Sequence, residues 1–226
     1  MSKCYSIAID GPAGAGKSTI ARRLAKELGY CYVDTGAVYR TVAYFLDLLG
    51  ISPKDADGVE RYIDELTVSL KYDDDGVQHV LMNGMDVSED IRAGDISQKA
   101  SLISAHAVVR EMLLDMQRDF AKKHNVIMDG RDIGTVVLPD ADVKIYLTAA
   151  AEVRAQRRYE ELIAKGQKVQ LEQVLKDILQ RDHQDTSRAI APLKQAADAV
   201  LVDSSQLDTD GVVAKVRAIV AEKIGV

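Results

Sequence analysis

Short apolar runs alternate with helically spaced apolar positions along most of the chain, which is the pattern of an α/β protein. The runs that predict strands occupy residues 5–9, 31–33, 125–129, 143–147 and 199–202. Amphipathic spacing predicts helices over residues 18–28, 35–49, 171–183 and 208–224, and over the segment that carries Arg154, Arg157 and Arg158. Because strands separated by helices usually run parallel, we expect a three-layer fold in which helices flank a central parallel sheet.

The alternation of strands and helices breaks after residue 52. A helix predicted at 57–66 leads into residues 67–87, where apolar and polar positions alternate around the turn signals 73–76 and Asn83-Gly84. This pattern predicts a small antiparallel meander inserted into the parallel fold. The acidic segment 73–76 lacks the ligand spacing and the terminal Glu of an EF-hand loop, which favours a turn over a calcium site.

Helical segments are predicted after the meander. Residues 88–91 resemble a short capped helix, and residues 95–124 predict a long helical region in two pieces joined near Ala105. Apolar side chains recur there at helical spacing, namely Val108, Met112, Leu113, Met116 and Phe120. We expect the methionines among them to fill the core rather than form a recognition surface.

Composition narrows the class of protein. The 226 residues fit one large domain or a domain with an insert, and no window of 18 apolar residues exists, so we expect no membrane partner. The net charge of −6, without a basic tract, argues against a nucleic-acid polymer as partner. Cys4 and Cys31 lack metal-ligand spacing and are expected to be buried thiols. With no room for a signal peptide, a cytoplasmic protein is expected, and nothing in the sequence demands more than a monomer.

The segment from Gly11 to Ser18 matches the phosphate-binding pattern G-x-x-x-x-G-K-[ST] between a predicted strand and a predicted helix. Its glycines let backbone N–H groups surround a polyphosphate, while Lys17 places a charge on the β- and γ-phosphates and the Ser18 hydroxyl can ligate Mg²⁺. A glycine-rich turn that binds nothing is the weaker alternative. The candidate ATP-binding residues are Gly11, Pro12, Ala13, Gly14, Ala15, Gly16, Lys17, Ser18 and Thr19.

Polar side chains follow the next predicted strand. Since ligands collect at the carboxyl ends of parallel strands, Thr35, Tyr39 and Arg40 are expected to face the same cleft as the phosphate loop. For Arg40, a solvated charge on the helix surface is an equally good interpretation.

Two aspartates and an arginine surround Gly130 where the predicted strand 125–129 ends. Charges gathered at a sheet edge are costly to desolvate unless they are paired or bind a ligand, and we favour a ligand. An acidic residue at the position of Asp129 also suits the magnesium water shell of a phosphate-loop fold.

Arg154, Arg157 and Arg158 occupy i, i+3 and i+4 positions, which places them on one helix face. Such a face could stabilise charge on a transferring phosphoryl group. The alternative is a solvated face balanced by neighbouring glutamates.

Four motifs occur in order along the chain: 9–19 (IDGPAGAGKST), 34–40 (DTGAVYR), 129–135 (DGRDIGT) and Asp182-x-x-Asp185-x-x-Arg188. Together with the inserted meander they resemble the bacterial cytidylate kinases from end to end. The resemblance implies a P-loop NTPase fold and transfer of the γ-phosphoryl group of ATP to CMP or dCMP, with Mg²⁺ as cofactor. It also implies a core of residues 1–50 and 105–226, a CMP-binding insert at about 60–104 and a mobile lid at about 152–168.

The resemblance also implies roles for individual residues. The CMP phosphate would be held by Thr35, Arg40, Arg131 and Arg188, and the base would be read by Ser101, Arg110 and Asp132. Asp185 would bind the sugar hydroxyls, with Tyr39 also on the CMP side. Catalysis would rest on Lys17, Asp129, Arg154, Arg157, Arg158 and Arg181. Thr35 stands where serine is frequent in the family, and it keeps the hydroxyl.

Hydrogen-bond polarity predicts the choice of base. Cytosine offers an N4 amino donor and an N3 acceptor, which suit a carboxylate (Asp132) beside a guanidinium (Arg110), whereas uracil reverses both. Because each unmet buried group costs about 1–3 kcal/mol, CMP should be preferred over UMP by at least roughly tenfold. The preference between CMP and dCMP stays open.

Two other classes remain as alternatives. A different small-molecule kinase, such as an adenylate, shikimate or dephospho-coenzyme A kinase, would share the phosphate loop but need not carry the segment 129–132 or the meander. A regulatory nucleotide switch would be expected to carry Asn-Lys-x-Asp, which does not occur in the sequence.

Overall fold

The computed structural model describes residues 3–226, and its centre is a five-stranded parallel sheet. The strand order is β2-β6-β1-β7-β8, with β1 in the middle. The strands are β1 (Ser6–Asp10), β2 (Cys31–Asp34), β6 (Val126–Gly130), β7 (Val143–Thr148) and β8 (Val200–Asp203). All four pairings are parallel, as the alternation of predicted strands and helices required.

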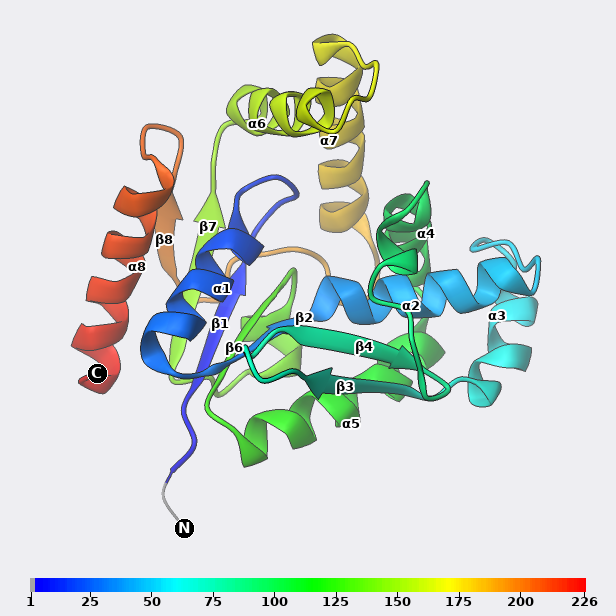
Figure 1. Cartoon of the computed structure of the whole chain (residues 1–226), viewed down its shortest axis with the longest axis horizontal. Helices are drawn as coiled ribbons and strands as arrows, with labels where there is room; N and C mark the ends of the chain where they lie inside the picture. Colours follow the sequence, from blue (N-terminus) through cyan, green and yellow to red (C-terminus); the bar gives the residue numbers. More distant parts are fainter. Residues whose placement is uncertain (1–2) are drawn as a thin grey trace.

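Helices cover both faces of this sheet because its strands are apolar on both sides (Figure 1). Ile7 and Ile9 of β1 pack with helices α1 (Lys17–Leu28) and α8 (Thr209–Ile224), while Ala8 packs on the opposite face. That face is covered by α5 (Ala107–Lys123) and by the short π-helical segment Ile133–Val137, hereafter the π turn. The three-layer fold is therefore confirmed.

The predicted antiparallel meander is present as a separate sheet in the order β3-β4-β5. Its strands are β3 (Val68–Tyr72), β4 (Gln78–Met82) and β5 (Met85–Asp86), and it lies between α3 (Ala56–Tyr62) and α4 (Ile96–Ile103) in sequence. Asp73 accepts hydrogen bonds from the backbone N–H groups of Asp75 and Val77, so the acidic segment forms a turn.

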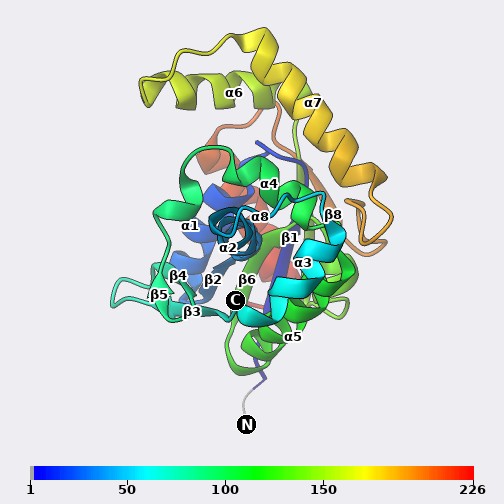
Figure 2. The same ribbon diagram turned by 90° about the vertical axis from the view of Figure 1, so that its right-hand side faces the viewer.

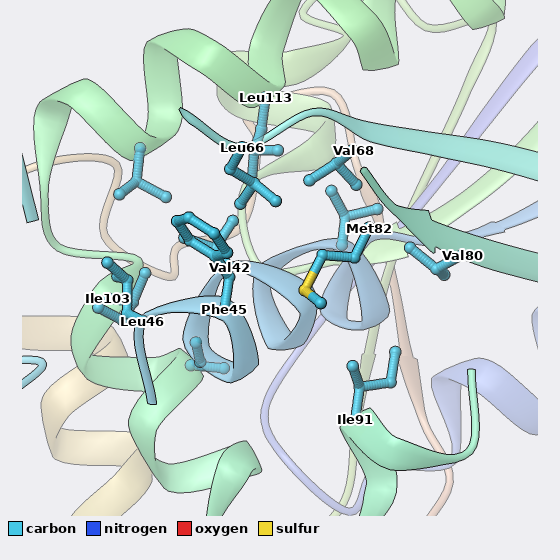
Figure 3. Close-up of a cluster of buried hydrophobic side chains, with 14 of the residues drawn as sticks. Val42, Phe45, Leu46, Leu66, Val68, Val80, Met82, Ile91, Ile103 and Leu113 are labelled. Atoms are coloured by element: carbon cyan, nitrogen blue, oxygen red, sulfur yellow. The ribbon is translucent and has the colours of Figure 1, made fainter. Parts of the chain in front are cut away.

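Helix α2 (Thr35–Leu48) supplies much of the apolar surface against which the insert folds. Figure 3 shows Phe45 and Val42 of α2 among side chains of β3, β4 and α5. The Gln78 side chain accepts a hydrogen bond of 2.8 Å from the Asp34 backbone N–H, which ties the small sheet to the end of β2. Residues assigned from the sequence to core and insert therefore share one hydrophobic cluster.

Helices α6 (Ala151–Ala164) and α7 (Leu171–Ser187) form a two-helix arm that arches over the carboxyl ends of the sheet (Figure 2). The arm has its own small apolar cluster, centred on Ala155, Val174 and Ile178. Among residues 3–226, no helix combines the length and apolar composition needed to cross a bilayer.

Several local predictions need correction. Helix α7 continues to Ser187 instead of ending at His183, and residues 63–65 form a 3₁₀ turn instead of ending the helix predicted at 57–66. The predicted capped helix at 88–91 is a 3₁₀ turn over Asp90–Arg92 without a side-chain cap, because the Ser88 hydroxyl accepts from Val80 instead. The two cysteines are free and half-buried, where fully buried thiols were expected.

In α5, the fully buried face contains Val109, Leu113 and Gln117. Most of the apolar residues predicted to form this face lie one position earlier in the sequence. Met112 and Met116 are partly buried against the core, which agrees with their expected packing role.

Candidate active site

The phosphate loop connects the central strand β1 to α1 and depends on glycine at its first position. Gly11 has φ +148°, and a Cβ there would lie 1.9 Å from the Leu147 carbonyl oxygen on β7. Gly14 has φ +75° and lies against Arg154, and Gly16 begins α1 with φ +87°. The loop therefore fits closely against its neighbours, as a backbone that must surround a ligand requires.

Lys17 is almost fully buried at the floor of the loop and donates a hydrogen bond of 2.8 Å to the Pro12 carbonyl. Burial, followed by the neighbouring Arg131 guanidinium, lowers the pKa of the Lys17 ammonium well below its ordinary value. Burial and Arg131 also lower the pKa of Arg181 to about 10. The buried cationic groups here lie close enough to repel one another, and an anionic ligand would relieve this repulsion.

Ser18 and Asp129 place side-chain oxygen atoms, which can bind a metal ion, beside the loop. The Ser18 hydroxyl donates to one Asp129 carboxylate oxygen at 2.8 Å, and the Tyr32 hydroxyl donates to the other at 2.9 Å. Burial raises the pKa of Asp129, and the nearby carboxylate of Asp34 raises it further.

These donors fit Mg²⁺, which takes hard oxygen ligands and uses one or two carboxylates with substrate phosphates and water. Among the described residues 3–226, no cluster of three or more His, Cys, Asp or Glu side chains could hold a metal by itself. A magnesium ion at Ser18 and Asp129 would therefore need the phosphates of a nucleotide as further ligands.

Asp132 lies at the centre of a buried ionic cluster on the other side of the cleft. Arg110 from α5 pairs with one of its carboxylate oxygens, and Arg188 approaches the other at 3.4 Å. Burial raises the pKa of Asp132, although both guanidinium groups oppose that shift. The backbone carbonyl of Ser104 accepts from Arg110 at 3.2 Å, and its hydroxyl accepts from Arg188 at 3.0 Å. The cluster presents an acceptor and donors side by side.

Asp185 organises a second ionic cluster, from inside α7. Arg131 donates to it at 2.7 Å, and the Ser101 hydroxyl on α4 donates to its other oxygen at 3.2 Å. Burial alone would raise the pKa of Asp185, but the guanidinium groups of Arg131, Arg181 and Arg188 together lower it. This carboxylate joins the two-helix arm to the insert and to the end of β6.

Residues at the start of α2 lie between the phosphate loop and the Asp132 cluster and complete the site. The Thr35 hydroxyl donates to the Asp129 carbonyl at 2.7 Å, and Arg40 pairs with the helix-capping Asp34 at 2.9 Å. The Nε of Arg40 is buried and has no hydrogen-bond partner among residues 3–226, so Arg40 is not a solvated surface charge. The Tyr39 ring lies 5.7 Å from the Arg110 guanidinium carbon, and burial raises the pKa of Tyr39 to about 12.

The arginines of the lid arm do not share one solvated face. Arg154 is buried and donates to the Ala13 carbonyl of the phosphate loop, the Ala149 carbonyl and the Asp182 carboxylate. Arg157 binds the Ser204 backbone and side chain, and Arg158 pairs with Glu161 on the surface. The Nε of Arg181 is buried, and no hydrogen-bond partner for it lies in the part of the chain that the structure describes. The three positions share one side of α6, but their surroundings differ because Arg154 packs inward against Gly14.

One cleft of about 1220 Å³ runs from the phosphate loop to the Asp132 cluster. All nine predicted CMP-binding residues line it, namely Thr35, Tyr39, Arg40, Ser101, Arg110, Arg131, Asp132, Asp185 and Arg188. The phosphate-loop and catalytic candidates that line it are Ala13, Gly14, Ala15, Gly16, Lys17, Ser18, Thr19, Asp129, Arg157, Arg158 and Arg181. Gly11, Pro12 and Arg154 lie behind its wall. The structure thus brings almost all the candidates together.

Four residues that support the site were not predicted from the sequence. They are Asp10, which binds the backbone after Asp132, Tyr32 on Asp129, Gln78 on Asp34, and Ser104 on both arginines of the Asp132 cluster. A carboxylate directly before the phosphate loop was a usable signal for Asp10. The other three lie in ordinary strand or helix patterns that give no signal.

Comparison with known sequences identifies the family of this chain. The family model for cytidylate kinase matches residues 7–222. A cytidylate kinase of Carboxydothermus hydrogenoformans is 48% identical over 217 residues, covering 96% of this chain and 97% of the relative. Those of Pelotomaculum thermopropionicum (48%, covering 96% of each chain) and Exiguobacterium sp. (45%, covering 98% of this chain and 99% of the relative) are similar over a comparable length. The chain belongs to the cytidylate kinase family of enzymes.

Proposed function

We propose that this enzyme transfers the γ-phosphoryl group of ATP to CMP or dCMP, producing ADP and CDP or dCDP. The observation that carries the proposal is the buried Asp132, held between Arg110 and Arg188 in the same cleft as the phosphate loop. A carboxylate beside a guanidinium complements cytosine, and the phosphate loop supplies the site for the donor.

At the donor end, the backbone amides of Gly14, Gly16 and Lys17 would bind the phosphates, with the Lys17 ammonium on the β- and γ-phosphates. Lys17 would exchange its bond to the Pro12 carbonyl for a phosphate oxygen. Ser18 and Asp129 would hold Mg²⁺, which would neutralise charge on the phosphates of the nucleotide. Asp129 also orients the Ser18 hydroxyl through their hydrogen bond.

At the acceptor end, the CMP phosphate would be held by Thr35, Arg40, Arg131 and Arg188. One of its oxygens attacks the γ-phosphorus in line with the departing ADP oxygen, so the P–O bond to ADP breaks as the bond to CMP forms. Little covalent work falls to the protein, and the rate depends on positioning and charge neutralisation. The Nε atoms of Arg40 and Arg181 support this because they are buried donors that no group within the described residues satisfies.

Base recognition would rest on Asp132 accepting from the N4 amino group and Arg110 donating to N3, with Ser101 nearby. Uracil would place its O4 against the carboxylate and its N3–H against the guanidinium. Since each unmet group costs about 1–3 kcal/mol, we expect CMP to exceed UMP by at least roughly tenfold in kcat/KM. Asp185 would bind the sugar hydroxyls.

Arg157, Arg158 and Arg181 would neutralise the transferring group when the arm closes over the cleft. Arg154 belongs to the proposed set as well, and its present bonds join the arm to the phosphate loop at Ala13. Closure would exclude water that could otherwise hydrolyse ATP. Residues 152–168 would move as the lid, with the insert moving on the CMP side.

The test is ADP production from ATP and Mg²⁺ with CMP, dCMP, UMP, AMP or shikimate as separate acceptors. Activity confined to the cytidine nucleotides and lost in Asp132→Ala supports the proposal. Asp119→Ala is the matched control, because it removes an exposed carboxylate of α5 that pairs only with Lys122. Equal ADP formation without any acceptor would overturn the proposal in favour of an ATPase or switch.

We also propose that the enzyme acts as a cytoplasmic monomer, since a single chain contains both the donor and acceptor walls of the cleft. Light scattering coupled to size-exclusion chromatography tests the oligomeric state, and a dimer mass at assay concentration would contradict it.

A further inference from the structure

The π turn directly follows Asp132 and departs from α-helical geometry. The backbone N–H groups of Val136 and Val137 both donate to the Asp132 carbonyl, at 2.9 and 3.1 Å, and Leu138 donates to Ile133 at 2.7 Å. Isolated π-helical segments are rare and frequently occur at functional sites. Side chains from two other elements form hydrogen bonds with the backbone of this turn and hold it in place.

Asp10 supports the beginning of the π turn. One carboxylate oxygen of Asp10 accepts from the Ile133 backbone N–H at 2.8 Å, and the other accepts from Gly134 at 2.7 Å. Asp10 is buried at the end of the central strand β1, directly before the phosphate loop. An ionised acceptor on two free N–H groups makes stronger hydrogen bonds than a neutral one.

Arg118 supports the other end. From α5 its guanidinium donates to the carbonyl of Val136 at 2.9 Å and to that of Val137 at 3.0 Å. A negative group thus binds the N–H end of the turn and a positive group binds its C=O end, which is the charge arrangement that stabilises helical backbone. Neither Asp10 nor Arg118 lies among the residues lining the cleft.

Tight packing leaves the π turn little freedom to move between these two groups. Ile133 is 1% exposed, and a Cβ on Gly130 would lie 2.7 Å from its Cδ1 atom. A Cβ on Gly134 would lie 3.1 Å from the side chain of Lys144. Loss of either polar support would therefore shift the backbone next to Asp132 together with the side chains that pack on it, by a fraction of an ångström.

We infer that Asp10 and Arg118 are positioning residues that hold the π turn at both ends and thereby set the base selectivity of Asp132. The inference rests on the proposed function, in which the Asp132 carboxylate reads cytosine. The π turn holds the backbone of Asp132 in place, and Arg110 and Arg188 hold its side chain. A carboxylate displaced by a fraction of an ångström loses its hydrogen bond to the N4 amino group while remaining inside the cleft.

The test compares Asp10→Asn and Arg118→Met with the wild type in steady-state kinetics with CMP, UMP and ATP. In Asp10→Asn the amide can accept one N–H but directs its own NH₂ at the other, so one of two bonds is lost. We expect KM for CMP to rise about tenfold and the CMP-to-UMP ratio of kcat/KM to fall about tenfold, with KM for ATP within about twofold. Arg118→Lys, which retains one charged donor, should recover part of the ratio that Arg118→Met loses.

Val216→Ala serves as the matched control for stability. Val216 is fully buried in α8 on the opposite face of the sheet, so its truncation lowers the melting temperature without touching the turn. The control should retain the wild-type CMP-to-UMP ratio when each protein is assayed well below its own melting temperature.

The outcomes separate the two proposals. If the wild type does not phosphorylate CMP, the proposed function fails. If it does, and both Asp10→Asn and Arg118→Met melt earlier but retain its KM for CMP and its CMP-to-UMP ratio, only the positioning role is overturned. Should Asp10→Asn not fold, Arg118→Met and Arg118→Lys decide the question.

Discussion

The two ends of the cleft are built in opposite ways. The phosphate loop consists of consecutive residues whose backbone does the binding, and its shape depends on glycine at Gly11, Gly14 and Gly16. The base pocket around Asp132 consists of side chains from α5, the end of β6 and the segment after α7, held by ion pairs. The loop is therefore fixed by local geometry, while the pocket is fixed by tertiary structure and is open to change by single substitutions.

The largest effect is expected from Lys17→Met, which should lower kcat/KM about 10²- to 10³-fold with CMP and dCMP alike. The ammonium acts on the phosphates that every acceptor reaction shares, so the CMP-to-UMP ratio should not change. Lys26→Met, on the exposed side of α1, is the control. A large change in base preference in Lys17→Met would show that the two ends of the cleft are not independent.

Gly11→Ala should destabilise the protein by about 3 kcal/mol, because its Cβ would collide with the Leu147 carbonyl and its φ is unfavourable for alanine. Gly50→Ala isolates the backbone part of this cost. Gly50 has φ +71° and no atom near the added Cβ, so about 1–2 kcal/mol is expected. Urea unfolding of both variants measures the difference, and equal losses would mean that the loop is not tightly fitted.

Stability should depend on pH through Asp10, the residue that joins the two ends. Burial raises the pKa of Asp10 from 3.8 to about 6, although the N–H groups of Gly134 and Ile133 oppose the shift. A carboxyl whose pKa is higher in the folded state contributes stability at low pH, and this contribution is lost as pH rises from about 4 to about 6, by at most about 3 kcal/mol. Asp10→Asn removes this group, so its stability relative to the wild type should improve across that pH range. If the unfolding free energies of the wild type and Asp10→Asn change in the same way from pH 4 to 7, the raised pKa of Asp10 would be contradicted.

The smallest kinetic effects are expected in the base pocket, where they should be strongly coupled. Arg110→Met and Asp132→Asn should each lower kcat/KM for CMP about 10- to 100-fold, since each leaves a buried partner unmatched. The double variant should lose less than the product of the two single losses. The exposed pair Lys122 and Asp119 on the same helix provides the control cycle, for which no measurable coupling is expected. Independent losses at Arg110 and Asp132 would argue that they do not act as one unit.

Prediction from the sequence succeeded where the signal is local. The strands were placed within about one residue of their observed bounds because each is a short apolar run with a polar or glycine boundary. The meander was predicted by alternation and two turns, and the phosphate loop by its own pattern. Helix α7 was predicted too short because Asp185, Thr186 and Ser187 are weak helix formers, although Asp185 is buried inside the helix.

Features that depend on distant pairing could not be predicted. Arg110 and Asp132 are 22 positions apart, and Arg131 and Asp185 are 54 apart, so no spacing rule connects them. The inward packing of Arg154 depends on the absence of a side chain at Gly14 on another element. The resemblance to cytidylate kinases supplied the pocket residues, but it assigned no role to Asp10, Tyr32 or the π turn.

The register of the central sheet has a consequence for how this enzyme can change. Strand β1 pairs with β6 so that Asp10 lies opposite Gly130, and the loops that follow them lead to the donor and acceptor sites. Inserting one residue into either strand would move its loop by about 3.3 Å along the sheet and turn every side chain to the opposite face. That shift equals the whole separation of two reacting atoms. Length variation should therefore be tolerated in the insert and the lid arm, but not within β1 or β6.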